Sequence, residues 1–178
     1  HVRSRRQRQM CKETDFEYIE LEDLIRKLED KEDARIFILD KIEDPHNFGA
    51  IARSCNFFGI DAIIFPNRRA ATVNDTVVKS SAGAIYDIDV CKVSNISQSI
   101  DKLKEAGFWI YATDPEGEDI RECDFSGKTA VVIGNEGKGV SKNILKNSDK
   151  TITIPNFSDF DSLNASVAAA IVMYEIRR

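Results

Sequence analysis

Short apolar segments alternate with amphipathic segments along most of the chain. Continuous apolar runs predict buried strands, and apolar residues spaced three or four positions apart predict helices. The predicted strands cover residues 34–40, 62–65, 86–90, 109–113, 130–133 and 151–154. The predicted helices cover residues 18–28, 47–58, 72–80, 96–106, 140–147 and 162–178.

This alternation predicts an α/β fold with a mostly parallel sheet that is covered by helices on both faces. Ligands bind to such sheets at the carboxyl ends of the strands. Unusual residues follow four of the predicted strands, after Leu39, Ala112, Ile133 and Ile154. Trp109 lies inside a predicted strand and is expected in the core.

Length and composition favour a single globular domain. The chain has 178 residues, of which 42% are hydrophobic and 31% charged, as in ordinary soluble proteins. We expect a basic flexible tail at residues 1–15 and one domain at residues 16–178. No apolar run approaches the ~20 residues of a membrane span, and the first ten residues do not form a signal peptide. A cytoplasmic protein without a membrane partner is the simplest interpretation.

Charge is distributed unevenly. Residues 1–12 carry five basic side chains and no acid, whereas the whole chain has a net charge of −5, which leaves −10 for the remainder (−5 minus +5). An acidic body does not bind RNA nonspecifically, so any RNA contact must come from local basic patches or from the basic segment.

The cysteines do not form a recognisable metal or disulfide pattern. Cys11, Cys55, Cys91 and Cys123 are widely separated, and the chain has only two histidines. We therefore expect buried or incidental thiols and no metal site.

The first candidate segment covers residues 44–54. Pro45 disfavours helical geometry at the residue before it, so a helix is predicted to begin near Asn47. Within that helix Gly49 and Arg53 lie four positions apart on one face. A small residue beside a guanidinium suits a phosphate or ribose oxygen, although an N-cap asparagine followed by a surface arginine explains the same residues.

The second candidate segment covers residues 131–141, where three glycines follow an apolar strand and precede a helix. Their backbone can approach a ligand closely. The spacing fits neither GxxxxGK[ST] nor GxGxxG, so a nucleotide-phosphate loop is not indicated, and a nicotinamide-dependent enzyme is disfavoured. Glu136 within the loop suits a cation or a sugar hydroxyl.

The third candidate segment covers residues 154–170. Ser162 is predicted to cap the last helix, with Asn164 and Ser166 in its first turns. Residues 168–170 are alanines that permit close packing. An ordinary capped helix explains the alanines but explains the residues at 162–164 less well.

Together the three segments resemble, in order and spacing, the three motifs of the SpoU/TrmH family (SPOUT superfamily) of RNA ribose 2′-O-methyltransferases. The matching residues are Asn47-x-Gly49-xxx-Arg53 with Phe58-Gly59, then Gly134-Asn135-Glu136-Gly137-x-Gly139, then Ile154-Pro155 and Ser162-Leu163-Asn164-x-Ser166-Val167-Ala168. A fourth piece, residues 81–84, is similar to the segment before the family's middle strand. The resemblance covers about residues 21–178.

The resemblance is strongest to the RlmB-like branch, through residues 39–47. It implies methylation of a ribose 2′-hydroxyl in a guanosine of 23S rRNA, with S-adenosylmethionine as cofactor. Two alternatives stay open: a transfer RNA substrate, and a non-catalytic RNA-binding or ribosome-assembly factor on the same fold. Many such proteins carry an additional N-terminal RNA-binding domain, which these 178 residues do not include.

The family also implies a C-terminal trefoil knot, a homodimer and a set of functional residues. By match of position, Arg53 is the catalytic residue, positioned with the ribose by Asn47, Glu136, Ser162 and Asn164. The positions that line or adjoin the cofactor pocket are Gly134, Ile154 and Leu163, then Thr113, Ile133, Asn135, Gly137, Pro155, Ser162 and Asn164. RNA is expected to approach along Arg53, Lys79, Lys138 and Lys142.

The chain departs from the family pattern in the third segment. Asn156 and Ser158 stand where methionine and glycine are common, and Ala165 stands where valine is common. These departures concern the shape of the cofactor-binding loop and leave the catalytic positions intact.

Overall fold

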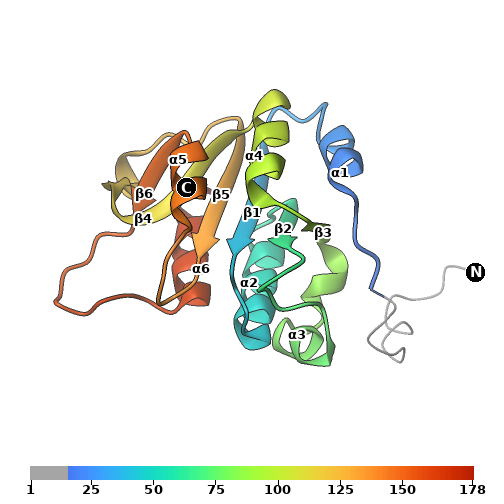
Figure 1. Ribbon diagram of the computed structural model, residues 1–178, viewed down its shortest axis with the longest axis horizontal. Helices are drawn as coiled ribbons and strands as arrows, with labels where there is room; N and C mark the ends of the chain where they lie inside the picture. Colours follow the sequence, from blue (N-terminus) through green and yellow to red (C-terminus); the bar gives the residue numbers. More distant parts are fainter. Residues whose placement is uncertain (1–15) are drawn as a thin grey trace, which may run out of the picture.

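The computed structural model describes residues 16–178, and the predicted tail at residues 1–15 lies outside them. Six strands form one sheet in the order β3-β2-β1-β5-β4-β6, and each paired neighbour is parallel (Figure 1). The strands are β1 (Ala34–Asp40), β2 (Ala62–Pro66), β3 (Asp89–Val93), β4 (Trp109–Asp119), β5 (Lys128–Gly134) and β6 (Lys150–Thr153). The predicted α/β class is confirmed.

Helices cover both faces of the sheet, as the apolar strands require. Along β1, Phe37 and Leu39 pack into one apolar core, whereas Ile36 and Ile38 pack into the other. The first core is closed by α2 (Pro45–Phe57), α3 (Asp75–Ser80), the 3₁₀ helices η2 (Ala84–Asp87) and η3 (Ile120–Glu122), and α6 (Ala165–Glu175). The second is closed by α1 (Leu21–Lys27), α4 (Ile96–Glu105) and α5 (Lys142–Asn147).

Several predicted boundaries were wrong. Helix α2 begins at Pro45, where proline is well tolerated, and the Asp44 side chain accepts a hydrogen bond from the His46 backbone N–H. The third strand begins at Asp89, because residues 84–87 form η2, whose N-cap is Gly83 with a φ of 81°.

Strand β4 continues past the predicted stop at residues 114–115. A register shift between Thr113 and Glu118 accommodates Pro115, and the second half of the strand pairs with β6. Gly117 permits this pairing, because a Cβ there would lie 2.6 Å from the backbone of Ile152. Trp109, predicted in the core, is 49% exposed at the beginning of the strand.

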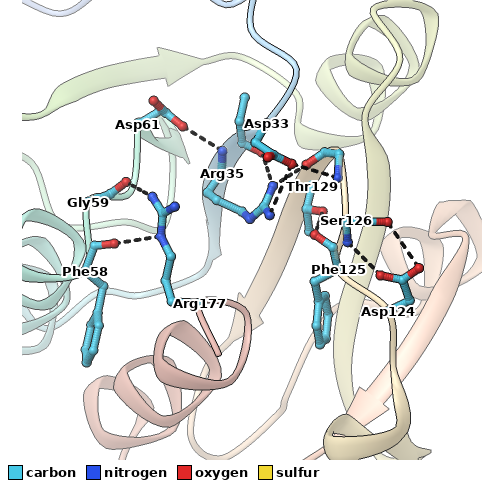
Figure 2. Close-up of polar contacts among 12 residues, drawn as sticks. Asp33, Arg35, Phe58, Gly59, Asp61, Asp124, Phe125, Ser126, Thr129 and Arg177 are labelled. Carbon is cyan, nitrogen blue, oxygen red and sulfur yellow. Dashed lines mark hydrogen bonds and ion pairs between the residues drawn. The ribbon is translucent and has the colours of Figure 1, made fainter.

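Arginines fix the structure at the end of the sheet opposite the candidate segments (Figure 2). Arg177, just after α6, donates from Nε to the Phe58 carbonyl at 2.8 Å and from a terminal nitrogen to the Gly59 carbonyl. It thereby ties the end of α6 to the end of α2. Buried Arg35 bonds to the Gly127 carbonyl, and its backbone N–H donates to Asp61 Oδ2 at 2.7 Å.

Within the described residues, Cys55 and Cys91 are buried and Cys123 is half-buried, and all three are free thiols. No group of three or more His, Cys, Asp or Glu side chains in residues 16–178 is placed to hold a metal ion. Over the same residues, no helix has the length and apolar character that a membrane crossing needs.

Candidate active site at the carboxyl edge of the sheet

The three candidate segments meet through Asn47, Glu136 and Asn164. Asn47 lies in the first turn of α2, Glu136 in the loop after β5, and Asn164 directly before α6. The Asn47 side-chain amide donates to Glu136 Oε1 at 2.9 Å, and the Asn164 amide donates to the same oxygen at 2.6 Å. Asn164 also donates to Asn47 Oδ1 at 3.0 Å. The three side chains therefore form a closed polar network.

Glu136 is the centre of this network. Its Oε1 accepts hydrogen bonds from the two amides and also from the backbone N–H of Ala165, at 3.1 Å. Ala165 is the first residue of α6. A carboxylate at a helix N-terminus is favoured by the helix dipole and by the free N–H groups there. These contacts hold the charge of Glu136 in one place.

Asn164 has a second role, as the N-cap of α6. Its Oδ1 accepts the backbone N–H groups of Ser166 at 2.9 Å and Val167 at 3.4 Å. The sequence prediction that Ser162 caps this helix was wrong. Instead, the Ser162 hydroxyl lies 3.5 Å from the Glu136 carbonyl oxygen and donates to it. Asn164 thus fixes the helix with its oxygen and the network with its nitrogen.

The glycine-containing loop after β5 is held by Asn135. Its Oδ1 accepts the Gly137 N–H at 2.9 Å, its backbone carbonyl accepts the Gly139 N–H at 2.8 Å, and its amide donates to the Lys41 carbonyl at 3.2 Å. Gly134 lies directly against the returning chain, because a Cβ there would lie 2.2 Å from the carbonyl carbon of Gly139. The sequence predicted that the backbone of these glycines approaches a ligand closely. In the structure, the close approach at Gly134 is to another part of the same loop.

Residues 154–164 form a loop between β6 and α6, and residues 156–164 of this loop are exposed (Figure 1). Asn156 organises its turn, since its amide donates to the Phe160 carbonyl at 2.6 Å and its Oδ1 accepts the Ser158 N–H at 2.9 Å. Phe157 and Phe160 are 88% and 76% exposed, and Leu163 is also exposed. The departures at Asn156 and Ser158 thus belong to one hydrogen-bonded turn that presents apolar side chains.

The other residues proposed to adjoin the cofactor lie within β4, near the end of β5 or directly after β6, and these three strands are neighbours in the sheet. The Thr113 hydroxyl donates to the Val132 carbonyl at 3.1 Å. Ile133 is buried, and Ile154 and Pro155 are half-buried. The structure therefore places Thr113, Ile133, Ile154 and Pro155 in or next to three neighbouring strands, and their contact with a cofactor stays a prediction.

Arg53 and Gly49 differ from the sequence expectation. Gly49 is buried against α3, because a Cβ there would lie 1.8 Å from Ser80 Oγ. It therefore serves helix packing rather than ligand approach. Arg53 is exposed on α2 and has no hydrogen bond or ion pair with any residue of the described part. Its guanidinium is free to bind a group from outside.

A second polar cluster adjoins this edge and was not anticipated from the sequence. Asp40 ends β1 and is buried, and its Oδ2 accepts the Ser141 N–H at 2.8 Å and the Ser141 hydroxyl at 2.6 Å. Lys41 donates to the same hydroxyl at 2.7 Å. A carboxylate directly after an apolar strand was the available signal. The cluster fixes the two ends of the glycine loop against β1.

Known proteins share this sequence pattern. A model of the SpoU rRNA Methylase family matches residues 34–174, which include all three segments. The chain belongs to the SpoU rRNA methylase family. An "Uncharacterized tRNA/rRNA methyltransferase" of Borreliella burgdorferi is 45% identical over 160 residues, covering 89% of this chain and 70% of that protein. The "Putative TrmH family tRNA/rRNA methyltransferase YacO" of Bacillus subtilis is 42% identical over 165 residues, covering 92% and 66%.

Solved structures of the family share the fold. The SpoU methyltransferase AviRb of Streptomyces viridochromogenes, in complex with the cofactor AdoMet, has a TM-score of 0.79 and 28% identity, covering 85% of this chain and 62% of that one. An AdoMet-bound rRNA methyltransferase of Sinorhizobium meliloti has a TM-score of 0.82 and 26% identity, covering 90% and 60%. The chain thus spans about two thirds of its relatives' length. The RlmB-like branch and the knot stay predictions.

Proposed function

We propose that residues 16–178 form a methyltransferase domain that transfers a methyl group from S-adenosylmethionine to a ribose 2′-hydroxyl of RNA. The proposed substrate is a guanosine of 23S rRNA. The convergence of Asn47, Glu136 and Asn164 carries this proposal. Asn47 and Asn164 lie 89 and 28 positions from Glu136 in the sequence, yet both donate to one oxygen of its carboxylate. These contacts are exposed, so core packing does not require a hydrogen-bond network among the three side chains. The network is best explained by a role in binding or catalysis.

The residues at this edge fit S-adenosylmethionine chemically. The cofactor carries an activated methyl group on a positively charged sulfonium. The fixed carboxylate of Glu136 supplies negative charge in the loop after β5, and the exposed Phe157, Phe160 and Leu163 offer apolar surface for an adenine ring. Gly134, Ile154 and Leu163 would line the pocket.

The protein's main task in this reaction is alignment. The 2′-oxygen forms a bond to the methyl carbon as the bond from that carbon to sulfur breaks, with the electron pair leaving on sulfur. Positioning two reactants in line supplies much of the acceleration in such displacements. Arginine keeps its proton at neutral pH. Arg53 would therefore bind the adjacent phosphate and orient the hydroxyl, while the hydroxyl proton passes to phosphate or water.

Asn47 and Asn164 act as positioning residues in this mechanism. They hold Glu136 in place, which in turn fixes the loop after β5 against the start of α6. Ser162 adds a hydrogen bond to the same loop. The ribose and the methyl donor would meet beside this assembly.

The family dimer has a candidate surface in this chain. An apolar groove of about 530 Å³ runs between α2 and α6, lined by Ala50, Phe58, Val167, Ile171 and Tyr174 among others. Its position next to Asn164 and Arg53 along the two helices supports a homodimer whose active site lies near the interface.

A methyl-transfer assay tests the proposed function. S-adenosylmethionine labelled in its methyl group is incubated with unmodified ribosomal RNA or transfer RNA. We expect label at a ribose of ribosomal RNA, with loss in Arg53→Ala. The control Arg26→Ala removes an equal charge from exposed α1 and should leave transfer unchanged. Near-wild-type turnover of Arg53→Ala at saturating RNA would refute the role of Arg53.

The same assay separates the alternatives. Label in transfer RNA alone would keep the chemistry and replace the substrate. Absence of label in either RNA, together with no cofactor binding by calorimetry, would support the non-catalytic RNA-binding factor. Intact Arg53, Glu136 and Asn164 favour the enzyme.

A further inference from the structure

A polar cleft lies at the carboxyl edge of the sheet, over the ends of β1, β2 and β3. Its volume is about 350 Å³, and its lining includes Asp40, Lys41, Arg68 and Arg69. Asn47, Glu136 and Asn164 do not line it. Its lining also includes residues of α4 and α5, two helices that pack on the face of the sheet opposite α2 and α6 (Figure 1).

The cleft concentrates positive charge in an acidic chain. Three cationic side chains and one carboxylate line it, whereas the whole chain has a net charge of −5. The Asp40 carboxylate is buried and accepts two hydrogen bonds from Ser141, so it does not pair with the arginines. Arg68 and Arg69 are exposed and have no hydrogen bond or ion pair within residues 16–178. Adjacent unpaired guanidiniums favour an anionic occupant.

Neutral donors complete the cleft. Ser94, Asn95 and Ser97 belong to its lining at the beginning of α4, a ten-residue helix whose N-terminus carries partial positive charge. Asn95 caps that helix, because its Oδ1 accepts the Gln98 N–H at 3.2 Å. Hydroxyl and amide groups beside arginines are the donors that phosphate oxygens use.

The backbone holds two of the cationic residues in an uncommon conformation. Lys41 has a φ of 60° and Arg69 a φ of 53°, and they are two of the three non-glycine residues with positive φ in the described part of the chain. Such conformations are costly for residues with a Cβ and gather at ligand sites. Lys41 is further fixed by its bond to Ser141.

We propose that this cleft binds a backbone phosphate of the substrate RNA. The polymer's identity rests on the proposed function, whereas the preference for an anion rests on the cleft itself. S-adenosylmethionine is a poor occupant, because its sulfonium and ammonium outweigh its single carboxylate. The Lys41 carbonyl accepts a hydrogen bond from Asn135, beside Glu136. A strand anchored in the cleft therefore lies next to the loop that adjoins the proposed reaction site.

The test compares two variants of the 178-residue chain with equal net charge. Arg68→Gln/Arg69→Gln removes two positive charges from the cleft. Lys27→Gln/Lys31→Gln removes two from exposed ion pairs with Asp89 and Asp61, near the amino ends of β3 and β2. Binding of unmodified ribosomal RNA transcripts is measured between about 50 and 200 mM KCl.

We expect the cleft variant to bind RNA about tenfold more weakly near 100 mM salt, with a salt dependence shallower by about one phosphate contact. The control variant should stay near wild type. Equal affinity of the two variants, or an equal loss in both, would overturn the proposal. Inorganic phosphate that protects wild type but not the cleft variant from heat, without an RNA difference, would also overturn it and assign the cleft to a free anion.

Two further readouts separate this proposal from the proposed function. In the methyl-transfer assay the cleft variant should raise KM for RNA and keep kcat at saturation, and its affinity for S-adenosylmethionine should be unchanged. If the cleft and control variants differ in RNA binding but the wild-type protein transfers no methyl group, only the proposed methyltransferase function is refuted. If the wild-type protein transfers methyl groups but the two variants bind RNA alike, only the proposed role of the cleft is refuted.

Discussion

Asn164 Nδ2 lies 2.6 Å from Glu136 Oε1, so the residue that caps the last helix also holds the central carboxylate of the candidate site. The two functions use different atoms of one side chain. The oxygen accepts backbone N–H groups of α6, and the nitrogen donates to Glu136 and Asn47. Substitutions can therefore separate stability from activity.

Asn164→Ala and Asn164→Ser should differ in stability and agree in activity. Alanine removes the cap, so the free energy of unfolding should fall by about 1 kcal/mol, whereas serine caps nearly as well as asparagine. Neither residue can donate an amide to Glu136. We expect methyl transfer to fall about tenfold to a hundredfold in both, because a misplaced site loses alignment.

Denaturant unfolding measures stability and the methyl-transfer assay measures activity, both on the same preparations. The Ser166 hydroxyl also bonds to Asn164 Oδ1, and Ser166→Ala provides a control that leaves the amide donors in place. If Asn164→Ser regained full turnover together with stability, the contact with Glu136 would have no part in catalysis.

Gly134→Ala should disrupt the loop after β5, while Gly137→Ala should not. A Cβ at residue 134 would lie 2.2 Å from Gly139 and 2.3 Å from Val140, both backbone atoms that cannot rotate away. At residue 137 the nearest atom would be Asn135 Oδ1 at 3.6 Å, an ordinary contact, and the backbone there has no positive φ. The two glycines are therefore a matched pair.

We expect Gly134→Ala to lower the free energy of unfolding by roughly 1–3 kcal/mol, as overpacked sites do, and to weaken S-adenosylmethionine binding in calorimetry. Gly137→Ala should bind the cofactor like wild type. Circular dichroism establishes that each variant is folded. Equal cofactor affinity in folded Gly134→Ala and wild type would show that the loop's shape is not needed for binding.

The sequence predicted the sheet because its strands are short and apolar, but it misplaced elements whose limits depend on tertiary contacts. Residues 86–88 look like a strand, yet residues 84–87 form η2, in which Ile85 is buried, and Ile88 is the buried residue that follows it. Pro115 looks like a strand end, yet pairing with β6 carries β4 past it. Trp109 is apolar but begins the strand at the surface.

The candidate site was predicted in composition but not in its bonds. Ser162 and Asn164 are both good N-cap residues, and only the position of Glu136 next to Ala165 selects between them. Gly49 could serve a ligand or a neighbouring helix, and only the position of Ser80 decides for the helix. Arg68 and Arg69 lie outside every motif, so the sequence alone could not predict that they line one cleft with Lys41.

Tyr111 should make the protein lose stability at alkaline pH. Its ring is buried on β4 and its hydroxyl donates to the Asp124 carbonyl. Burial raises the pKa of this tyrosine to about 12 from its ordinary 10.0. Between these two values the unfolded chain has released the proton and the folded chain has kept it, so stability falls as pH rises through this window.

Tyr111→Phe should therefore show a shallower loss of stability between about pH 10 and 12, by up to about 1.4 kcal/mol per pH unit. At neutral pH the variant should be less stable by about 1 kcal/mol, since it lacks the hydrogen bond to Asp124. Burial also raises the pKa of the Cys91 thiol to about 12, which adds the same slope to both proteins and cancels in the comparison. Urea unfolding at a series of pH values measures the difference. Parallel curves for the two proteins would show that the Tyr111 hydroxyl titrates alike in the folded and unfolded chains.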